Sequence, residues 1–308
     1  MTNKPLALST MYAQQERFED GAAFARYAAS AGYDAIEISH STRIEKLEAI
    51  IASNVLPISS VHQSAPWVRL ADGRGNSKLN LASTDEGERR EAVAHATASI
   101  EWAAKVGATK SVCHLGAVGD GIEMYPEEYE MRRLFDGGQA ASDRFASLRE
   151  IAIATRKARA APFLDAARRS LRELVAVAAP KGITIGIENR YHYHEIPHPA
   201  EYAFLLDGLD LDQAGYWHDT GHAEVLHRLG FIDRHAWLGA LSAKAVGAHL
   251  HDVEGIGDHR APGDGDVAWA YIQAGLRHLP AYTLEINQWQ PDEKVISAPA
   301  FLASVGLR

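Results

Sequence analysis

The sequence predicts a single α/β domain with the (β/α)8 architecture of a TIM barrel. Eight short apolar runs alternate with longer helical segments along its 308 residues. Runs of this length without a polar face are typical of strands buried on both sides of a parallel sheet. An open, doubly wound sheet is the alternative, but no Gly-x-Gly-x-x-Gly turn follows the first run. Repeated strand–helix alternation therefore favours the closed barrel.

The expected strands share an apolar character and end at or near a polar residue. In chain order they cover residues 6–11, 33–38, 56–62, 109–114, 183–188, 214–219, 246–250 and 282–287. In a barrel of parallel strands all carboxyl ends meet at one mouth, where active sites of this architecture lie. The polar residues that end these runs are therefore expected to lie close together.

Helices are expected between the strands, at 18–31, 43–52, 84–108 and 162–179, with shorter ones after the fifth to eighth strands. The third opens with Ser83-x-x-Glu86, the pattern of a capping box. The fourth stops at Pro180-Lys-Gly182, a typical helix end. These signals place the helix boundaries.

One segment does not fit the regular alternation. Residues 116–161 follow the fourth strand and contain Gly119-Asp-Gly121, Gly137-Gly138 and six arginines. A long insertion at this place overhangs the active-site face of a barrel. We interpret it as a helical lid or a subunit contact, which leaves a homo-oligomer open, with a solvated helix pair as an equal alternative. No repeat or linker divides residues 1–308, so one domain is expected.

Composition excludes several classes of protein. The formal net charge is −9, from 31 Lys and Arg against 40 Asp and Glu, and no basic stripe marks a nucleic-acid partner. The single cysteine, Cys113, forms no intrachain disulfide, which fits a reducing cytoplasm. No signal-peptide pattern is present, and no apolar stretch approaches the roughly 20 residues of a membrane span. We therefore expect a cytoplasmic protein that binds no membrane.

Residues that bind metals recur at the strand ends. They are His62, His114, Glu188, Asp219 with the nearby His222, His249 and Glu285. Burying so many carboxylates and imidazoles together is costly without a cation. The sequence therefore predicts a divalent metal site at the mouth of the barrel.

Other histidines and the cysteine are given ordinary roles. His95, His227, His235 and His278 lie on helical stretches, and His192, His194 and His198 lie in one polar segment. Side chains alternate along a strand, so Cys113 faces the helices if His114 faces the barrel interior. A catalytic thiol is therefore not expected.

Taken in order, the strand-end motifs resemble the xylose-isomerase-like barrels, over nearly all of the chain except 116–161. This superfamily includes metal-dependent sugar epimerases and isomerases and the type-IV apurinic endonucleases. The motifs are Ser-Val-His62, Val-Cys-His114-Leu-Gly, Gly-Ile-Glu188-Asn-Arg, His-Asp219-Thr-Gly-His222-Ala, His249-Leu-His-Asp, Asp-His259-Arg-Ala-Pro-Gly-Asp-Gly and Leu-Glu285-Ile-Asn. Each motif is weak by itself, and their order is specific to the superfamily rather than to one activity.

The epimerase branch implies one metal, often manganese or cobalt, held by four side chains. These are Glu188, Asp219, His249 and Glu285 in this sequence. The two glutamates also act as acid and base in that branch. His222 and Arg260 are implied as contacts to the substrate.

The endonuclease branch implies three zincs instead. His62, His114 and Glu188 match the ligands of the first, and the four residues of the epimerase site match the second. His222 and His259 match two ligands of the third, whose remaining position falls on Gly257, one residue from Asp258. That departure places the third metal in question.

Chemistry of the central four residues favours the first branch. Three carboxylates and one imidazole suit Mn, Mg or Co, with Zn or Fe as further candidates. Such a metal polarises a carbonyl, and a glutamate on each side of the neighbouring carbon can remove and return a proton. We therefore predict a sugar isomerase or epimerase that works through an enediolate. A lyase that acts through the same enediolate is not distinguished from it by the sequence. A multi-zinc phosphodiester hydrolase is the alternative, and a silent sugar-binding module would have lost a central ligand.

The remaining predicted contacts are assigned to a small carbohydrate substrate. His62, His114, His222 and His259 serve it directly or hold additional zinc, and Arg260 and Trp67 are expected beside it. Aromatic rings pack against sugar C–H faces, so Tyr12, Trp217 and Trp289 are further candidates, with core packing equally expected for each.

Overall fold

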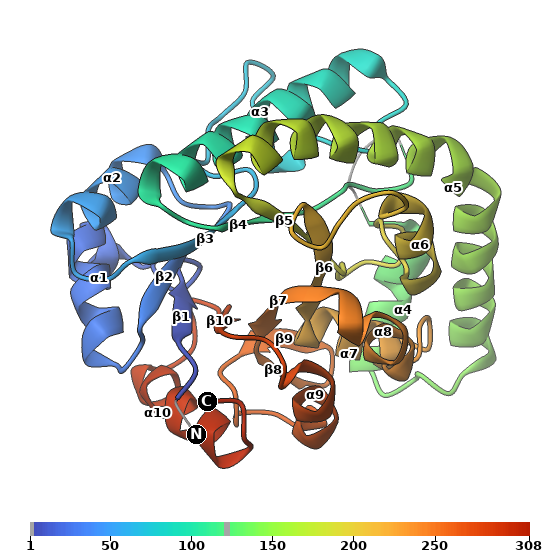
Figure 1. Cartoon of the computed structure of the whole chain (residues 1–308). Helices are drawn as coiled ribbons and strands as arrows, with labels where there is room; N and C mark the ends of the chain where they lie inside the picture. Colours follow the sequence, from blue (N-terminus) through green and yellow to red (C-terminus); the bar gives the residue numbers. More distant parts are fainter. Residues whose placement is uncertain (1–2, 120–123) are drawn as a thin grey trace.

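The computed structural model describes residues 3–119 and 124–308, and within them it has the predicted barrel. Eight parallel strands close in the order β1-β10-β7-β6-β5-β4-β3-β2, with helices around them (Figure 1). The strands are β1 Leu6–Ser9, β2 Ala35–Ile38, β3 Ile58–His62, β4 Lys110–Cys113, β5 Thr184–Glu188, β6 Ala214–Asp219, β7 Ala245–Leu250 and β10 Tyr282–Leu284. Each falls in or overlaps its predicted run, so the fold class is confirmed.

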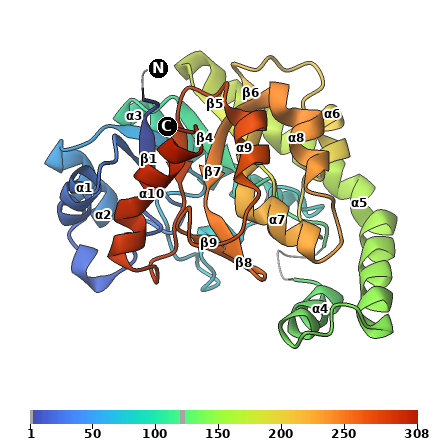
Figure 2. The same ribbon diagram turned by 90° about the horizontal axis from the view of Figure 1, so that it is seen from below.

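Helices form a layer around the strands (Figure 1). The helices are α1 Gly21–Ser30, α2 Ile44–Ser53, α3 Glu86–Val106, α4 Pro126–Asp136, α5 Asp143–Ala178, α6 Tyr202–Leu205, α7 Thr220–Arg228, α8 His235–Leu241, α9 Trp269–Leu276 and α10 Asp292–Ser304. Helix α4 packs against α5 outside that layer (Figure 2). The C-terminal end of the chain lies near the start of β1, because α10 returns next to this strand (Figures 1 and 2). No helix in the described residues is both long and apolar enough to cross a membrane.

The N-terminal cap of α3 differs from the predicted capping box. Asp85, rather than Ser83, caps this helix, and its carboxylate accepts a hydrogen bond from Glu88 N at 2.8 Å. Ser83 Oγ accepts one from Asp85 N at 3.1 Å instead. A carboxylate is both an efficient cap and a favourable charge at a helix N-terminus, which places the start of α3 at Glu86.

The predicted helix at 162–179 is the second half of the 36-residue helix α5, so its predicted start at Pro162 is wrong. Proline lacks only one backbone donor, and the buried face continues through it from Phe145 to Phe163 and Leu171. Packing of that face offsets the lost hydrogen bond. The predicted helix end is confirmed, since Gly182 adopts a left-handed conformation with φ 69°.

The predicted insertion forms α4 and the first half of α5. Both project beside the barrel on the same side as the hairpin of β8 Asp252–Glu254 and β9 Gly257–Arg260 (Figure 2). That side is the carboxyl end of the strands, since the hairpin follows β7. Asp120 and Gly121 of the predicted glycine-containing loop lie outside the described residues. The antiparallel hairpin itself was not predicted, because its strands are short and polar.

Side-chain alternation along the strands divides the barrel interior into two layers. The upper layer, near the carboxyl ends, holds Glu37, His62, Glu188, His249 and Glu285, which are all buried. Two residues earlier on the same strands, the lower layer holds Ala35, Ser60, Gly186, Gly247 and Thr283. The upper layer is therefore polar and titratable, and the lower layer is made largely of small residues.

Candidate active site

Four side chains from neighbouring strands converge at the carboxyl end of the barrel. Glu188, Asp219, His249 and Glu285 each offer one ligand atom, and these atoms all lie within 4.8 Å of one another. Glu188, Asp219 and His249 are fully buried, and Glu285 is 2% exposed. The four predicted metal ligands are thus brought together, from β5, β6, β7 and the end of β10.

The His249 imidazole compensates part of the negative charge of the carboxylates in this cluster. His249 Nδ1 bonds to Glu188 Oε1 and lies 3.2 Å from Glu285 Oε2. Burial alone would raise the pKa of Glu188. The charge of His249, and the hydrogen bonds that Glu188 accepts from His114 and His249, instead hold that pKa well below its usual range. Three buried carboxylates still outnumber one imidazole. A divalent cation that prefers oxygen ligands fits this set of donors.

Asp219 is oriented by the start of helix α7. It is the N-terminal cap, and Oδ1 accepts a hydrogen bond from His222 N at 2.7 Å. His251 Nε2 donates to both carboxylate oxygens at 2.9 Å, and Asn189 Nδ2 binds the Asp219 carbonyl at 2.9 Å. These hydrogen bonds fix the direction of the Asp219 carboxylate, as outer partners do for the ligands of metal sites.

Glu37 is a member of the site that sequence reasoning missed. Its carboxylate lies 3.0 and 3.1 Å from His249 Nε2 and accepts from Ser60 Oγ at 2.7 Å. Since Nε2 donates to Glu37, the Nδ1 side of the ring faces the three other carboxylates. The available sequence signal was an acidic residue inside the apolar run Ala35–Ile38. Such a run predicts a buried strand, and a carboxylate is seldom buried without a partner.

Replacing Glu37 with glutamine is expected to weaken divalent-metal affinity by about 10- to 100-fold, because the imidazole loses the charged acceptor that orients it. Competition with a chromophoric chelator measures this change. Glu45→Gln, the same substitution at an exposed position of α2, is the matched control. Equal metal affinity in E37Q and E45Q would contradict the orienting role of Glu37.

A second group, His62, His114 and Glu188, lies directly beside the first. His62 Nδ1 bonds to the Gln63 carbonyl at 2.9 Å, so that Nε2 faces Glu188 Oε2 at 3.5 Å. His114 Nε2 lies 2.6 Å from the same oxygen. These two predicted histidines therefore adjoin the central cluster through Glu188.

Arg190 supplies a positive charge to this second group. Its guanidinium donates to Glu188 Oε2 at 2.8 Å and to Glu195 Oε1 at 3.0 Å, and it also contacts His114 Nε2. Burial and then the Arg190 charge hold the pKa of His114 well below its ordinary value. A cation at His62, His114 and Glu188 would have to share its carboxylate with this guanidinium.

A third group contains Asp219, His222 and His259. His222 Nδ1 bonds to the Asn189 carbonyl at 2.9 Å, which leaves Nε2 directed at Asp258 Oδ2, 3.7 Å away. His259 Nδ1 lies 3.0 Å from Asp258 Oδ1. The carboxylate of Asp258, which follows Gly257 in the sequence, therefore lies beside both histidines of this group.

A pocket of about 300 Å³ opens over these groups, within the range of small-molecule sites. Its lining consists of Met11, His40, His62, His114, Arg190, Tyr191, His192, His222, Asp258, His259 and Glu285. His40, which was not predicted, packs its ring 5.0 Å from that of His62. Burial lowers the pKa of the His40 imidazole to about 3, so it is neutral at physiological pH.

The insertion contacts one wall of this pocket. Glu128 of α4 is fully buried, lies 3.0 Å from His192 Nδ1, and accepts from Tyr193 N at 2.9 Å. Arg132 binds the Tyr191 carbonyl at 3.0 Å and lies over the Tyr191 ring. Helix α4 thereby holds the loop that supplies Tyr191 and His192 to the pocket.

Two predicted substrate contacts are not among the residues that line the pocket. Arg260 bonds to the carbonyl and carboxylate of Asp264, both at 2.6 Å, within the segment that follows the hairpin. Trp67 stacks under the guanidinium of Arg43, 5.1 Å away. Neither lines the pocket, nor do Tyr12, Trp217 and Trp289, and the aromatic side chain that does is Tyr191.

Comparison with known proteins agrees with this architecture. The structure of a D-tagatose 3-epimerase-like protein superposes with a TM-score of 0.65 at 18% identity, covering 98% of this chain and 96% of the other. D-psicose 3-epimerase from Clostridium cellulolyticum H10, solved with D-tagatose, gives 0.65 at 16% identity over 98% and 99%. IolI with a bound zinc atom gives 0.64 at 13% identity over 98% of each chain.

At these identities the structural likeness shows the fold alone, and no curated protein matches the sequence significantly. The family described as xylose isomerase-like TIM barrel matches residues 25–305, which is most of the chain. The chain therefore belongs to the xylose isomerase-like TIM barrel family.

Proposed function

We propose that this protein is a divalent-metal-dependent epimerase or isomerase of a keto or aldo sugar or a close derivative. The observation that carries the proposal is the buried convergence of Glu188, Asp219, His249 and Glu285 under a small polar pocket. Support also comes from the structural neighbours, two of which are named for 3-epimerisation of D-tagatose or D-psicose. The pocket volume suits a small molecule rather than a polymer.

Glu188 and Glu285 are the proposed acid–base pair. They approach the mouth from strands three positions apart in the barrel order, so a small substrate can lie between them. One carboxylate removes the proton beside the carbonyl, and the other returns a proton on the opposite face. A divalent cation held by the four residues supplies Lewis-acid polarisation of the substrate oxygens when bound.

Polar side chains around the pair are proposed to hold the substrate hydroxyls. His222 and the neutral His40 line the pocket, where His222 Nε2 can accept a hydrogen bond because Nδ1 donates to the Asn189 carbonyl. The guanidinium of Arg190 offers fixed donors beside Glu188. Tyr191 and His192 form the wall that α4 supports and give the sugar ring an apolar face.

Metal analysis combined with a sugar panel tests this function. The protein, purified without added metal, is expected to carry about one divalent ion per chain at the central site. Manganese- or cobalt-loaded protein is then incubated with ketopentoses and ketohexoses, and new epimers or aldoses are resolved by chromatography. Conversion that stops with a chelator and returns with metal supports the proposal, and inertness toward every sugar while the ion is bound would refute it.

A multi-zinc hydrolase resembling the type-IV apurinic endonucleases is the second candidate. What favours it is that three further groups share a carboxylate with the central one, namely His62–His114–Glu188, Asp219–His222–His259 and His40–His62–Glu285. Against it, Arg190 already neutralises Glu188 on the side of the first group. Two or three zincs per chain would favour this candidate.

The zinc-loaded protein is expected to leave duplex DNA with a single abasic site uncut over many turnovers. The net charge of −9 and the lack of a basic stripe disfavour binding to a phosphate backbone. Incision is followed on a denaturing gel with a labelled strand. Chelator-sensitive cleavage of many substrate molecules per enzyme would place the hydrolase first.

A further inference from the structure

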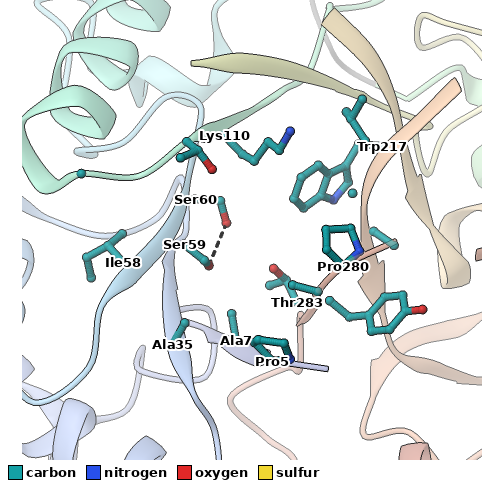
Figure 3. A pocket seen from close by; sticks show the side chains of 17 residues that line it. Pro5, Ala7, Ala35, Ile58, Ser59, Ser60, Lys110, Trp217, Pro280 and Thr283 are labelled. Atoms are coloured by element: carbon teal, nitrogen blue, oxygen red, sulfur yellow. Dashed lines mark hydrogen bonds between the residues drawn. The ribbon is translucent and has the colours of Figure 1, made fainter. Parts of the chain in front are cut away.

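A second pocket lies at the opposite end of the barrel from the candidate active site. It measures about 230 Å³ and is lined by the amino-terminal parts of the strands and the segments before them (Figure 3). Its lining includes Ala35, Ile58, Ser60, Lys110, Trp217 and Gly247. A cavity of roughly 150 Å³ in another protein holds benzene. This pocket has room for a larger molecule.

The pocket exists because the lower layer of the barrel is under-filled. TIM barrels usually fill this layer with bulky branched side chains. Here Ala35, Ser60 and Gly247 occupy inward positions, and the large side chains that line this part of the barrel include Trp217 and Lys110. A Cβ atom on Gly247 or Gly186 would come within 2.0 or 2.5 Å of the Trp217 indole, so these glycines hold the ring across the barrel.

Trp217 separates the two sites. Its ring packs edge-on against His249 above, with centroids 5.2 Å apart, and the same side chain lines the pocket below. Ser60 provides a polar connection as well, because it lines the pocket and donates to Glu37 at 2.7 Å. The lower pocket is therefore distinct from the active site but shares a wall with it.

The chemistry of the lining selects a class of ligand. Lys110 is the only charged residue among those that line the pocket, and no described carboxylate pairs with its ammonium group. Its side chain extends across the pocket toward Trp217 (Figure 3). Burial lowers the pKa of Lys110, so an anionic partner would stabilise its charged form. The remaining walls are mostly apolar, from Ile58, Val246 and Pro280.

We propose that this lower pocket binds a small organic carboxylate with a compact apolar body. The carboxylate pairs with Lys110 Nζ, and the body packs against Trp217 and the apolar wall. A monocarboxylate fits better than inorganic phosphate, because a single ammonium group offers few donors to a dianion among apolar side chains.

Benzoate is the probe, and the indole N–H signals of the ¹⁵N-labelled protein are the readout. The chain has six tryptophans, and Trp217→Phe assigns the signal of Trp217. The protein is titrated as purified, and the Lys110→Met variant distinguishes benzoate in the lower pocket from benzoate bound to an ion at the upper site. We expect saturable movement of the Trp217 signal with benzoate, and no movement with benzamide or phosphate at the same concentration.

Two variants locate the binding. Lys110→Met keeps the aliphatic stem but removes the charge, and it should raise the dissociation constant of benzoate at least about tenfold, the loss of one charge-assisted contact. Lys157→Met, on the exposed face of α5, is the matched control. Ala35→Leu fills the pocket and should abolish binding while the circular dichroism spectrum stays unchanged.

The proposal is overturned if about 10 mM benzoate leaves the Trp217 signal in place, or if K110M binds benzoate as the wild type does. Equal binding of benzamide or phosphate also overturns it, because the carboxylate would then not be recognised. Since every measurement concerns binding at the lower pocket and none concerns turnover, failure here is independent of the proposed sugar chemistry.

Discussion

Glutamine in place of Glu285 is expected to reduce turnover of the proposed sugar substrate by about 10²- to 10⁴-fold, the usual contribution of a positioned acid or base. The same change at Glu188 should have a similar effect. Both residues are buried against His249, so each substitution removes a proton acceptor and one charge of the proposed metal site. Initial rates at saturating metal measure the loss, and Glu293→Gln, exposed on α10, is the matched control.

Isotope exchange distinguishes proton removal from other routes to the same product. In D₂O the product is expected to carry deuterium at the carbon beside the carbonyl, because the carboxylates exchange with solvent between removal and return. E188Q and E285Q should slow this labelling together with turnover. An unlabelled product that keeps all deuterium placed on the substrate carbon would indicate hydride transfer and would exclude the proposed pair.

Asparagine in place of Asp219 is expected to abolish tight metal binding while the fold stays intact. The carboxylate is fully buried among His249, His251 and His222, where its charge balances that of a cation. Asparagine caps a helix about as well as aspartate, so the start of α7 should survive. Metal content after dialysis and far-UV circular dichroism measure the two expectations separately.

Asp165→Asn, at an exposed position of α5, controls for the change of one surface charge in that experiment. A D219N protein that retains the wild-type stoichiometry and affinity for metal would remove Asp219 from the site. The central assignment would then have to be rebuilt around Glu188, His62 and His114.

The alternation of apolar runs and helices was enough to predict the barrel, because burial on both faces leaves strands with a continuous apolar sequence. The same regularity predicted the convergence of Glu188, Asp219, His249 and Glu285, since a closed parallel barrel brings all carboxyl ends to one mouth.

Local signals for helix boundaries were less reliable than this alternation. Pro162 lies inside α5, because packing of a buried face outweighed the loss of one backbone hydrogen bond.

Side-chain direction beyond the strand ends was not available from the sequence. Arg260 follows His259 directly, yet its guanidinium turns to Asp264, while Arg190 reaches Glu188 from the loop after β5. Trp67 packs with Arg43, and Tyr191 lines the pocket instead. Which of several similar residues reaches a site depends on loop paths, which pattern and spacing do not encode.

The sequence by itself therefore determined the fold and the set of strand-end residues that meet, because both follow from a periodicity of two along strands and from closure of the barrel. Only the tertiary structure decided how those residues are held. Glu37 behind His249, Arg190 beside Glu188 and α4 against the Tyr191 loop are contacts between segments far apart in the chain. Such contacts depend on the packing of several elements at once, so no local stretch of sequence specifies them.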